Sequence, residues 1–367
     1  MKRILFISNV PSPYQVEYLN ELGKLAQVHA VFERGASSER DKSWKDLNVK
    51  TFTCSILRGI NIGANTAFCP GVTKYIKKRD YDYLIFGNPL TPTGILQILY
   101  CKAHKIPFIL QSEGGLAKNG KGPKERFKKF IMKDAQLYLS GMRKNEYFLT
   151  YGATPDTVWS YPFASLYQKD IRTAAPSQEE KQVLRKELGM KEEQVLLYVG
   201  RFIPVKGVDV LIKACVELGE NTGIYLVGGE APPEYLDLVA QYGVQNVHFV
   251  SHIGLHELKK YYLAADLFVL PTRSDTWGLV INEAMSCGLP VITTTRCVAG
   301  LDLIEEGKNG YLVPVEDAEL LHRRIAELLD APSLVAEMAS NNIRLIQDYS
   351  YEKMAARIFS GLQSIDN

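Results

Sequence analysis

Two carboxylates in the segment SDTWGLVINEAMSCGLPVI, residues 274–292, stand eight positions apart. Asp275 follows an apolar run typical of a strand, and a helix starting near Trp277 would place Glu283 roughly 9 Å farther along its axis at ~1.5 Å per residue. Carboxylates that act on one glycosidic bond face each other, whereas carboxylates staggered along a helix suit opposite ends of a long ligand. A sugar nucleotide is such a ligand. The alternative, which the pattern alone favours, is that Asp275 caps the helix and Glu283 is a solvated surface residue.

Two cations lie in the segment YVGRFIPVKGVDVLIKA, residues 198–214. Arg201 follows a predicted strand, and Lys206 stands where the next helix is expected to begin. The unpaired N–H groups of a helix start, together with these cations, would form a diphosphate site. Two solvated loop cations are the other interpretation. The chain has no GxGxxG after its first strand and no GxxxxGK[ST], which argues against simple dinucleotide and P-loop sites.

The elements that must position these residues alternate between apolar strands and helices, which predicts parallel sheets covered on both faces. The fold class that we predict is α/β, with two tandem Rossmann-like doubly wound domains facing a cleft. Ligands of such sheets bind beyond the carboxyl ends of the strands. The strands are expected at residues 3–8, 28–32, 83–86, 108–111, 136–139 and 157–160 in the first domain, and at 195–200, 223–228, 246–251, 266–271, 290–294 and 310–314 in the second. The polar segment 167–182, which lacks an apolar period, is the predicted linker.

Composition restricts the class of protein. A chain of 367 residues exceeds the size of most single cores. A formal charge of +2 does not mark the whole chain as a nucleic-acid binder, so any basic surface must be local. Six cysteines without metal-site spacing suit a reducing compartment. Because no apolar run approaches the ~18 residues of a membrane helix and the start lacks the features of a signal peptide, we predict a cytoplasmic protein.

Four motifs carry a resemblance to a known family: GRFIPVKGVDVLIKA, LVGGE, HIGLHELKKYYLAADLFVLPT and DTWGLVINEAMSCGLPVIT. In this order and spacing they resemble the carboxyl-terminal domain of retaining GT-B-fold glycosyltransferases, family 4. The resemblance covers about residues 195–329 and is weaker over the first domain. It implies a nucleoside-diphosphate sugar donor bound mainly by the second domain, an acceptor bound by the first, and no obligatory metal or other cofactor.

The resemblance also implies the domains and site residues. Residues 1–168, completed by a carboxyl-terminal helix at about 350–367, would bind the acceptor, and residues 169–349 would bind the nucleotide-sugar. The donor-binding residues would be Gly200, Arg201, Lys206, Glu230, Asp275, Thr276, Trp277, Gly278, Leu279 and Glu283. The acceptor-binding residues would be Tyr14, Gln15, Gly114 and Gly115. Catalytic roles fall to Asp275, Arg201, Lys206 and Glu113.

Two departures from the family pattern matter. Asp275 occupies the first position of the family's E-x7-E motif, and Thr276-Trp277 replaces the more usual Gly-Phe; the shorter carboxylate leaves open which hexose hydroxyls it reaches. Glu113-Gly114 stands where many members have His-Gly. Glu113 would orient the sugar or the acceptor, or it is a carboxylate at a helix start.

The function that we predict is retaining transfer of a hexose-type sugar, with a UDP-sugar favoured, to a saccharide acceptor in surface polysaccharide or glycolipid biosynthesis. The family implies a same-face displacement in which the departing phosphate helps to deprotonate the acceptor hydroxyl. The alternatives are a GT-B-fold epimerase, which needs no acceptor, a phosphorylase, which needs free phosphate, and a non-catalytic sugar-nucleotide-binding module.

Two further signals concern a membrane and a metal. The segment Lys118 to Lys133 carries seven basic residues against one acid, with Phe127 and Phe130 at helical spacing. It is either a solvated helix face or a basic amphipathic segment that lies on the inner face of the plasma membrane, near a lipid-linked acceptor. Asp80-Tyr81-Asp82 matches the metal-chelating DxD tripeptide of another glycosyltransferase fold but precedes a strand, where acids often end a turn. We therefore predict no metal site and no nucleic-acid partner.

Overall fold

The computed structural model describes residues 1–35, 48–63, 65–117, 122–143 and 146–366. Contacts divide the chain into two compact units. Unit 1 comprises Met1–Ala164 and Ser350–Asn367, and unit 2 comprises Ser165–Tyr349. The predicted domain boundary after residue 168 lies four residues beyond the end of the first segment of unit 1.

Unit 1 is built on a parallel sheet with strand order β3-β2-β1-β6-β7-β8-β9. Its strands are β1 (Arg3–Ser8), β2 (Gln27–Phe32), β3 (Thr53–Ile56), β6 (Tyr83–Phe86), β7 (Ile109–Ser112), β8 (Leu137–Ser140) and β9 (Val158–Ser160). A separate antiparallel pair is formed by β4 (Ile60–Asn61) and β5 (Ala67–Phe68). The strands read as apolar runs because helices cover both faces of the sheet.

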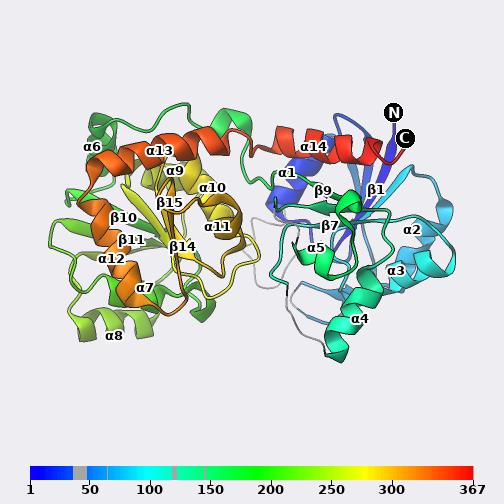
Figure 1. The fold of residues 1–367 in the computed structure, drawn as a ribbon, viewed down its shortest axis with the longest axis horizontal. Helices are drawn as coiled ribbons and strands as arrows, with labels where there is room; N and C mark the ends of the chain where they lie inside the picture. The colour runs from blue at the N-terminus through cyan, green and yellow to red at the C-terminus, as the bar shows by residue number, and fades with distance from the viewer. Residues whose placement is uncertain (36–47, 64, 118–121, 144–145, 367) are drawn as a thin grey trace. The chain divides into compact units, whose positions relative to one another are not determined.

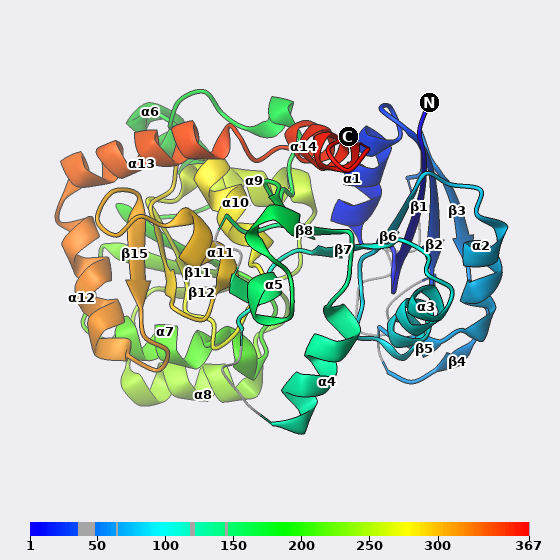
Figure 2. The same ribbon diagram turned by 45° about the vertical axis from the view of Figure 1, so that its right-hand side comes forward.

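The helices of unit 1 form two layers (Figure 2). On one face α1 (Pro13–Leu22) packs against α14 (Tyr351–Gln363), so that the end of the chain completes the unit that its beginning starts. On the other face lie α2 (Thr73–Lys78), α3 (Pro92–Ala103) and α4 (Pro123–Met132). The Ser350 hydroxyl caps α14 by accepting a hydrogen bond from the backbone N–H of Lys353.

Unit 2 is built on a second parallel sheet, with strand order β12-β11-β10-β13-β14-β15. Its strands are β10 (Gln194–Val199), β11 (Thr222–Val227), β12 (Val247–Val250), β13 (Leu267–Leu270), β14 (Val291–Thr294) and β15 (Gly310–Val313). In both units the strand order reverses beside the first strand, at β1/β6 and at β10/β13. Such a reversal is where open α/β sheets bind ligands.

Helices also cover both faces of the second sheet (Figure 1). One layer contains α7 (Val208–Ala214), α8 (Pro233–Tyr242) and α12 (Ala318–Leu329). The other contains α6 (Gln178–Glu187), α9 (Leu255–Ala264), α10 (Leu279–Ser286) and α13 (Pro332–Ile346). The short helix α11 (Val298–Leu303) follows β14. The predicted doubly wound α/β class is therefore confirmed for each unit.

The predicted linker was wrong in its second half, because α6 begins at Gln178 inside it. The buried face of this helix carries cations instead of apolar side chains. Lys181 Nζ lies 2.8 Å from Asp266 Oδ1, and Arg185 Nη2 lies 2.6 Å from Asp266 Oδ2. Because both cations are nearly buried, α6 shows no apolar period although it packs on the domain.

Candidate active site

The loop that follows β10 is fixed against the end of β13. A single 3-10 turn, Pro204–Lys206, precedes Gly207, whose φ of 70° is left-handed. A Cβ at Gly207 would lie 2.1 Å from the carbonyl oxygen of Pro271, so a larger residue would push the two loops apart. Arg201 and Lys206 thus stand at the carboxyl ends of the strands where the order of the sheet reverses.

Lys206 and Asp275 are joined across these loops. Lys206 Nζ donates a hydrogen bond to Asp275 Oδ2, and the two side chains are only 18% and 16% exposed. Asp275 therefore does not cap a helix. The helix α10 begins at Leu279, two residues later than expected, after Gly278 with a φ of 99°. The assumed start near Trp277 is thus two residues too early, and Gly278, in the left-handed region, lies between Trp277 and the helix.

Glu283 lies within α10 and is partly buried. Its Oε2 accepts a hydrogen bond of 2.9 Å from the Tyr262 hydroxyl. Burial raises the pKa of the Glu283 carboxyl to about 7, although the bond from Tyr262 offsets part of the shift. Glu283 is therefore not a freely solvated surface residue, and a carboxylate poised near neutrality stands one helical turn into α10.

The other predicted donor residues divide into exposed and buried groups. The side chains of Arg201, Glu230 and Thr276 are exposed, and Leu279 is partly buried. Trp277 is only 2% exposed, and its Nε1 donates to Asn282 Oδ1 at 2.8 Å, so its indole belongs to the core. The backbone of Gly200 packs closely against Gly228, which follows β11. A Cβ added to Gly228 would lie only 1.8 Å from the carbonyl oxygen of Gly200.

The predicted acceptor residues gather in unit 1, beyond the ends of β1 and β7. The Tyr14 hydroxyl donates a hydrogen bond to Glu113 Oε1. Burial and the adjacent Glu113 carboxylate hold the pKa of Tyr14 well above its usual value. A cavity there is lined by Phe6, Tyr14, Gln15, Tyr18, Gly87, Gln111, Glu113 and Phe163. Gln15 is 6% exposed, and its Oε1 has no hydrogen-bond partner in the part of the chain that the structure describes.

Gly114 and Gly115 continue the loop after Glu113. A Cβ at Gly115 would lie 2.8 Å from the ring of Tyr147, which shows that the aromatic ring packs directly on this backbone. A Cβ at Gly141 would lie 2.2 Å from the carbonyl oxygen of Glu113. The loop is thus held by close backbone packing on both sides.

Residues 180–345 match the family model described as glycosyl transferases group 1. This part of the chain is a group 1 glycosyltransferase domain. D-inositol 3-phosphate glycosyltransferase 2 of Catenulispora acidiphila is 33% identical over 193 residues, which cover 48% of this chain and 45% of the relative. D-inositol 3-phosphate glycosyltransferase of Thermobispora bispora is 32% identical over 194 residues, covering 48% and 45%. The chain spans about half the length of the curated relatives that it matches.

Solved structures resemble the whole chain. HepE of Anabaena in complex with UDP has a TM-score of 0.79 at 20% identity, covering 99% of this chain and 100% of that one. WaaG, a glycosyltransferase involved in lipopolysaccharide biosynthesis, has a TM-score of 0.65 at 18% identity, covering 99% and 98%. These likenesses confirm the predicted GT-B fold.

Sequence reasoning missed two residues of the glycosyltransferase domain, Tyr262 and Arg273. Tyr262 bonds to Glu283 from α9, and Arg273 forms ion pairs with Asp209 and Glu316. Their partners lie 21 to 64 positions away in the sequence. No local motif marks such pairs; only the strand order brings them together.

Among the described residues no group of three or more His, Cys, Asp or Glu side chains is arranged to hold a metal ion. The carboxylates of the DxD-like tripeptide bind Arg3 instead: its side chain pairs with Asp80, and its backbone N–H donates to Asp82 Oδ2 at 2.6 Å. Both carboxylates have a structural role at the start of β6.

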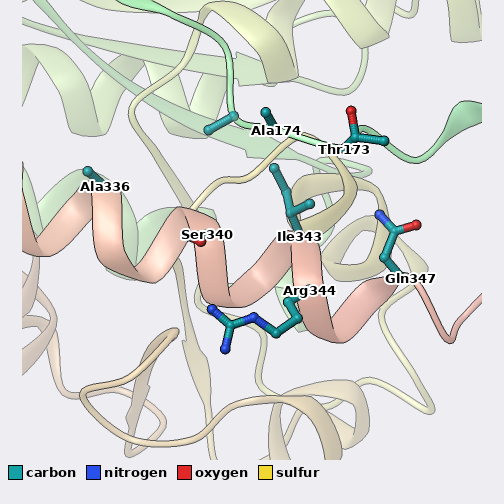
Figure 3. Close-up of a pocket in the computed structure, with 8 residues that line it drawn as sticks. Thr173, Ala174, Ala336, Ser340, Ile343, Arg344 and Gln347 are labelled. Atoms are coloured by element: carbon teal, nitrogen blue, oxygen red, sulfur yellow. The ribbon is translucent and has the colours of Figure 1, made fainter.

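A hollow of unit 2 lies between residues 173–175 and α13 (Figure 3). Its lining residues are Thr173, Ala174, Ala175, Ala336, Ser340, Ile343, Arg344 and Gln347. The Ile343 side chain points toward Ala174, whereas the Arg344 side chain points away from this segment. None of the predicted donor residues lines the hollow, so it is distinct from the candidate donor site.

The basic segment of unit 1 is described from residue 122 onward, and residues 118–121 of the prediction lie outside the described residues. Helix α4 exposes Phe127 and Phe130, which are 49% and 50% accessible. Lys102 Nζ and Lys133 Nζ lie 5.2 and 5.9 Å from the centre of the Phe130 ring. Exposed aromatic rings and cations therefore share this surface. In the described part of the chain, none of the helices has the length and apolar character needed to cross a bilayer.

Proposed function

We propose that the protein is a retaining glycosyltransferase that moves a hexose-type sugar from a nucleoside-diphosphate sugar, a UDP-sugar first, to a saccharide acceptor. The observation that carries this proposal is the Lys206–Asp275 contact at the point where the strand order of the group 1 domain reverses. It combines a cation suited to a diphosphate with a carboxylate suited to sugar hydroxyls. The structure of HepE with UDP-glucose supports UDP as the first nucleotide to test.

In this proposal the donor lies along the carboxyl end of the second sheet. Arg201 and Lys206 neutralise the charge that grows on the leaving diphosphate, which lowers the barrier to cleavage of the sugar–phosphate bond. Asp275 binds hexose hydroxyls, and Glu283 accepts hydrogen bonds from the ribose. The departing phosphate takes the proton of the acceptor hydroxyl as the new bond forms on the same face of the sugar.

The acceptor is assigned to the loops of unit 1 beyond the ends of β1 and β7, where the partly buried Tyr14–Glu113 pair offers polar groups to a saccharide hydroxyl. The cavity beneath this pair, ≈ 10 Å³, has room for about one water molecule, which the buried, unpartnered Oε1 of Gln15 would bind. A lipid-linked saccharide is favoured because α4 offers exposed phenylalanines among lysines on the same unit. Such an acceptor fits a role in surface polysaccharide or glycolipid biosynthesis.

The experiment is calorimetric titration of the purified protein with UDP, GDP and ADP, repeated with Lys206→Ala, followed by turnover of the matching nucleotide-sugars. Selective binding of one nucleotide that is lost in the variant, and transfer to a saccharide with retained anomeric configuration by NMR, is the expected result. Turnover without an acceptor would indicate an epimerase, and turnover that needs free phosphate would indicate a phosphorylase. Binding without turnover would indicate a non-catalytic module.

A further inference from the structure

We propose that Arg273 is a positioning residue that holds Lys206 in place for the donor diphosphate; the inference rests on the proposed function, which gives Lys206 that task. Arg273 stands three positions after the end of β13 and two before Asp275. It was not singled out by the sequence motifs. Its contacts converge on the turn that carries Lys206.

The backbone of that turn is bound from the loop after β13. The backbone N–H of Arg273 donates to the carbonyl oxygen of Val205 at 2.8 Å, and the Thr272 hydroxyl donates to the same oxygen at 3.0 Å. Arg273 Nη1 donates to the carbonyl oxygen of Pro204. The two carbonyl groups that immediately precede Lys206 are therefore both fixed by the β13 loop, and Arg273 binds each of them.

The guanidinium of Arg273 is at the same time tied to two carboxylates. Its Nη1 and Nη2 form a bidentate pair with Asp209, at 2.9 and 2.7 Å, in the first turn of α7. Its Nε donates to Glu316 Oε1, and Nη2 donates to Glu316 Oε2 at 3.0 Å. With the bond to Pro204, all five N–H groups of the guanidinium have a protein partner. Arg273 is therefore committed to the protein, whereas the side chain of Arg201 is exposed and available to a ligand.

These bonds also fix the charge state of the cluster. Hydrogen bonds to Asp209 and to Glu316 raise the pKa of Arg273 further above its usual value. Burial of Asp209 would raise the pKa of its carboxyl, but the bonds from Arg273 hold it below its usual value. Arg273 and Asp209 stay ionised near neutral pH, so charge-assisted bonds hold the turn.

The geometry explains why the residue is arginine. A lysine at position 273 would have three N–H donors on one nitrogen and could not make the five hydrogen bonds that the planar guanidinium makes to Asp209, Glu316 and the Pro204 carbonyl group. Without the guanidinium group of Arg273, the turn Pro204–Lys206 would lose the bond to the Pro204 carbonyl group. The β13 loop would then hold the turn only through its two bonds to the Val205 carbonyl oxygen. Lys206 would then move relative to Asp275, and a displacement of about 1 Å at a reacting site can cost roughly 100-fold.

The test is a double-mutant cycle on nucleotide affinity. We expect Arg273→Gln to weaken UDP binding roughly 10- to 100-fold by calorimetry, and Arg273→Lys to give little rescue. In the Lys206→Ala background the same change should cost much less, because the residue through which Arg273 acts is gone. An equal loss in both backgrounds overturns the proposal.

Arg324→Gln is the matched control. Arg324 belongs to the same unit, has a similarly accessible side chain at 32% against 29%, and pairs with Glu327 and Glu306. We expect this change to lower the melting temperature without changing UDP affinity; a loss of affinity equal to that of Arg273→Gln would show a general structural effect and overturn the proposal.

Glu316→Gln covers the case in which Arg273→Gln fails to fold. Glu316 is 57% exposed, so its replacement leaves the bidentate pair with Asp209 in place. We expect a smaller loss of UDP affinity in the same direction, and unchanged affinity in this folded variant overturns the positioning role. If the wild-type protein binds UDP and Arg273→Gln binds it equally well, only the positioning role fails. If the wild-type protein binds none of UDP, GDP and ADP, the proposed function fails and this inference with it.

Discussion

Lys206 Nζ donates a hydrogen bond to Asp275 Oδ2 across the loops that follow β10 and β13. The contact joins the cation assigned to the diphosphate with the carboxylate assigned to the hexose. Because both side chains are largely buried, the pair is more than a surface ion pair, and removal of either partner leaves the other charge without compensation. A donor diphosphate must therefore share Lys206 with Asp275 or take it over.

The two partners are predicted to respond oppositely to neutralisation. Asp275→Asn should bind bare UDP at least as tightly as the wild-type protein, because the carboxylate no longer competes for Lys206. The same variant should lose transfer by about 100- to 1,000-fold, the scale of a missing transition-state contact. Calorimetry with UDP and steady-state transfer from the UDP-sugar measure the two effects.

Lys206→Ala should instead weaken UDP binding strongly, since it removes the cation and leaves the Asp275 carboxylate beside the phosphates. Asp237→Asn, an exposed change on α8, is the control and should alter neither quantity. A loss of UDP affinity in Asp275→Asn as large as that in Lys206→Ala would place Asp275 among the supports of the diphosphate site.

Glu283 is predicted to make nucleotide binding depend on pH near neutrality. Burial raises its pKa from the ordinary 4.5 to about 7, so the carboxyl loses its proton as the pH rises through 7. If the ionised form accepts bonds from the ribose, UDP affinity should rise between pH 6 and 8. The terminal phosphate of UDP also titrates near pH 6, so the same titration with Glu283→Gln supplies the baseline. If UDP affinity depends on pH in the same way in the wild-type protein and in Glu283→Gln, Glu283 does not bind the nucleotide.

The same pKa predicts how Glu283 affects stability. Between about pH 4.5 and 7 the folded protein binds the Glu283 proton and the unfolded chain does not, so this group's contribution to stability falls as the pH rises through that window. Glu283→Gln should therefore melt at a higher temperature than the wild-type protein at pH 8 and at nearly the same temperature at about pH 4, below the pKa of the unfolded chain. Thermal unfolding at both pH values, without nucleotide, measures this. A variant that is less stable at pH 8 would contradict the pKa shift.

In unit 1, the hydrogen bond from Tyr14 to Glu113 is predicted to serve the acceptor. Tyr14→Phe should lower kcat/KM for the acceptor about tenfold, because it leaves the partly buried Glu113 carboxylate without one of its donors. UDP affinity should stay unchanged, since neither residue is assigned to the donor. Tyr83→Phe is the matched control. Tyr83 is the first residue of β6, away from the carboxyl ends of the strands, and its hydroxyl donates a hydrogen bond to Asp366. Equal losses in the two variants would point to a general effect on unit 1.

The sequence predicted all six strands of the second sheet, six of the seven strands of the first, and the loops that carry Arg201, Lys206 and Asp275, because buried parallel strands are continuous apolar runs. It missed β3, whose side chains are exposed or only partly buried and include two hydroxyl groups. It did not predict α6, because Lys181 and Arg185 fill the place of apolar residues and Asp266 neutralises them. The sequence also did not predict the Lys206–Asp275 contact or the ion pairs of the Arg273 guanidinium group. The residues of these pairs are separated by 43 to 69 positions in the chain. Such pairs depend on the strand order, which periodicity does not encode.

Helix α4 is predicted to bring the protein to anionic lipid. Phe127 and Phe130 are about half exposed, and Lys133 lies over the Phe130 ring, so an apolar and a cationic group enter an anionic interface together. The wild-type protein should co-sediment with vesicles that contain an anionic phospholipid more than with neutral vesicles, and less so at high salt. The double variant Phe127→Ser with Phe130→Ser should lose this binding.

The control for that variant must remove an equally exposed apolar side chain elsewhere. Leu236 on α8 of unit 2 is 49% exposed, the same fraction as Phe127, so Leu236→Ser should leave vesicle binding unchanged. Transfer to a water-soluble acceptor should be the same in all three proteins, because α4 carries none of the residues assigned to donor or acceptor. If the wild-type protein binds neutral and anionic vesicles equally weakly, the exposed phenylalanines of α4 are part of a solvated helix face and the lipid-linked acceptor loses its structural support.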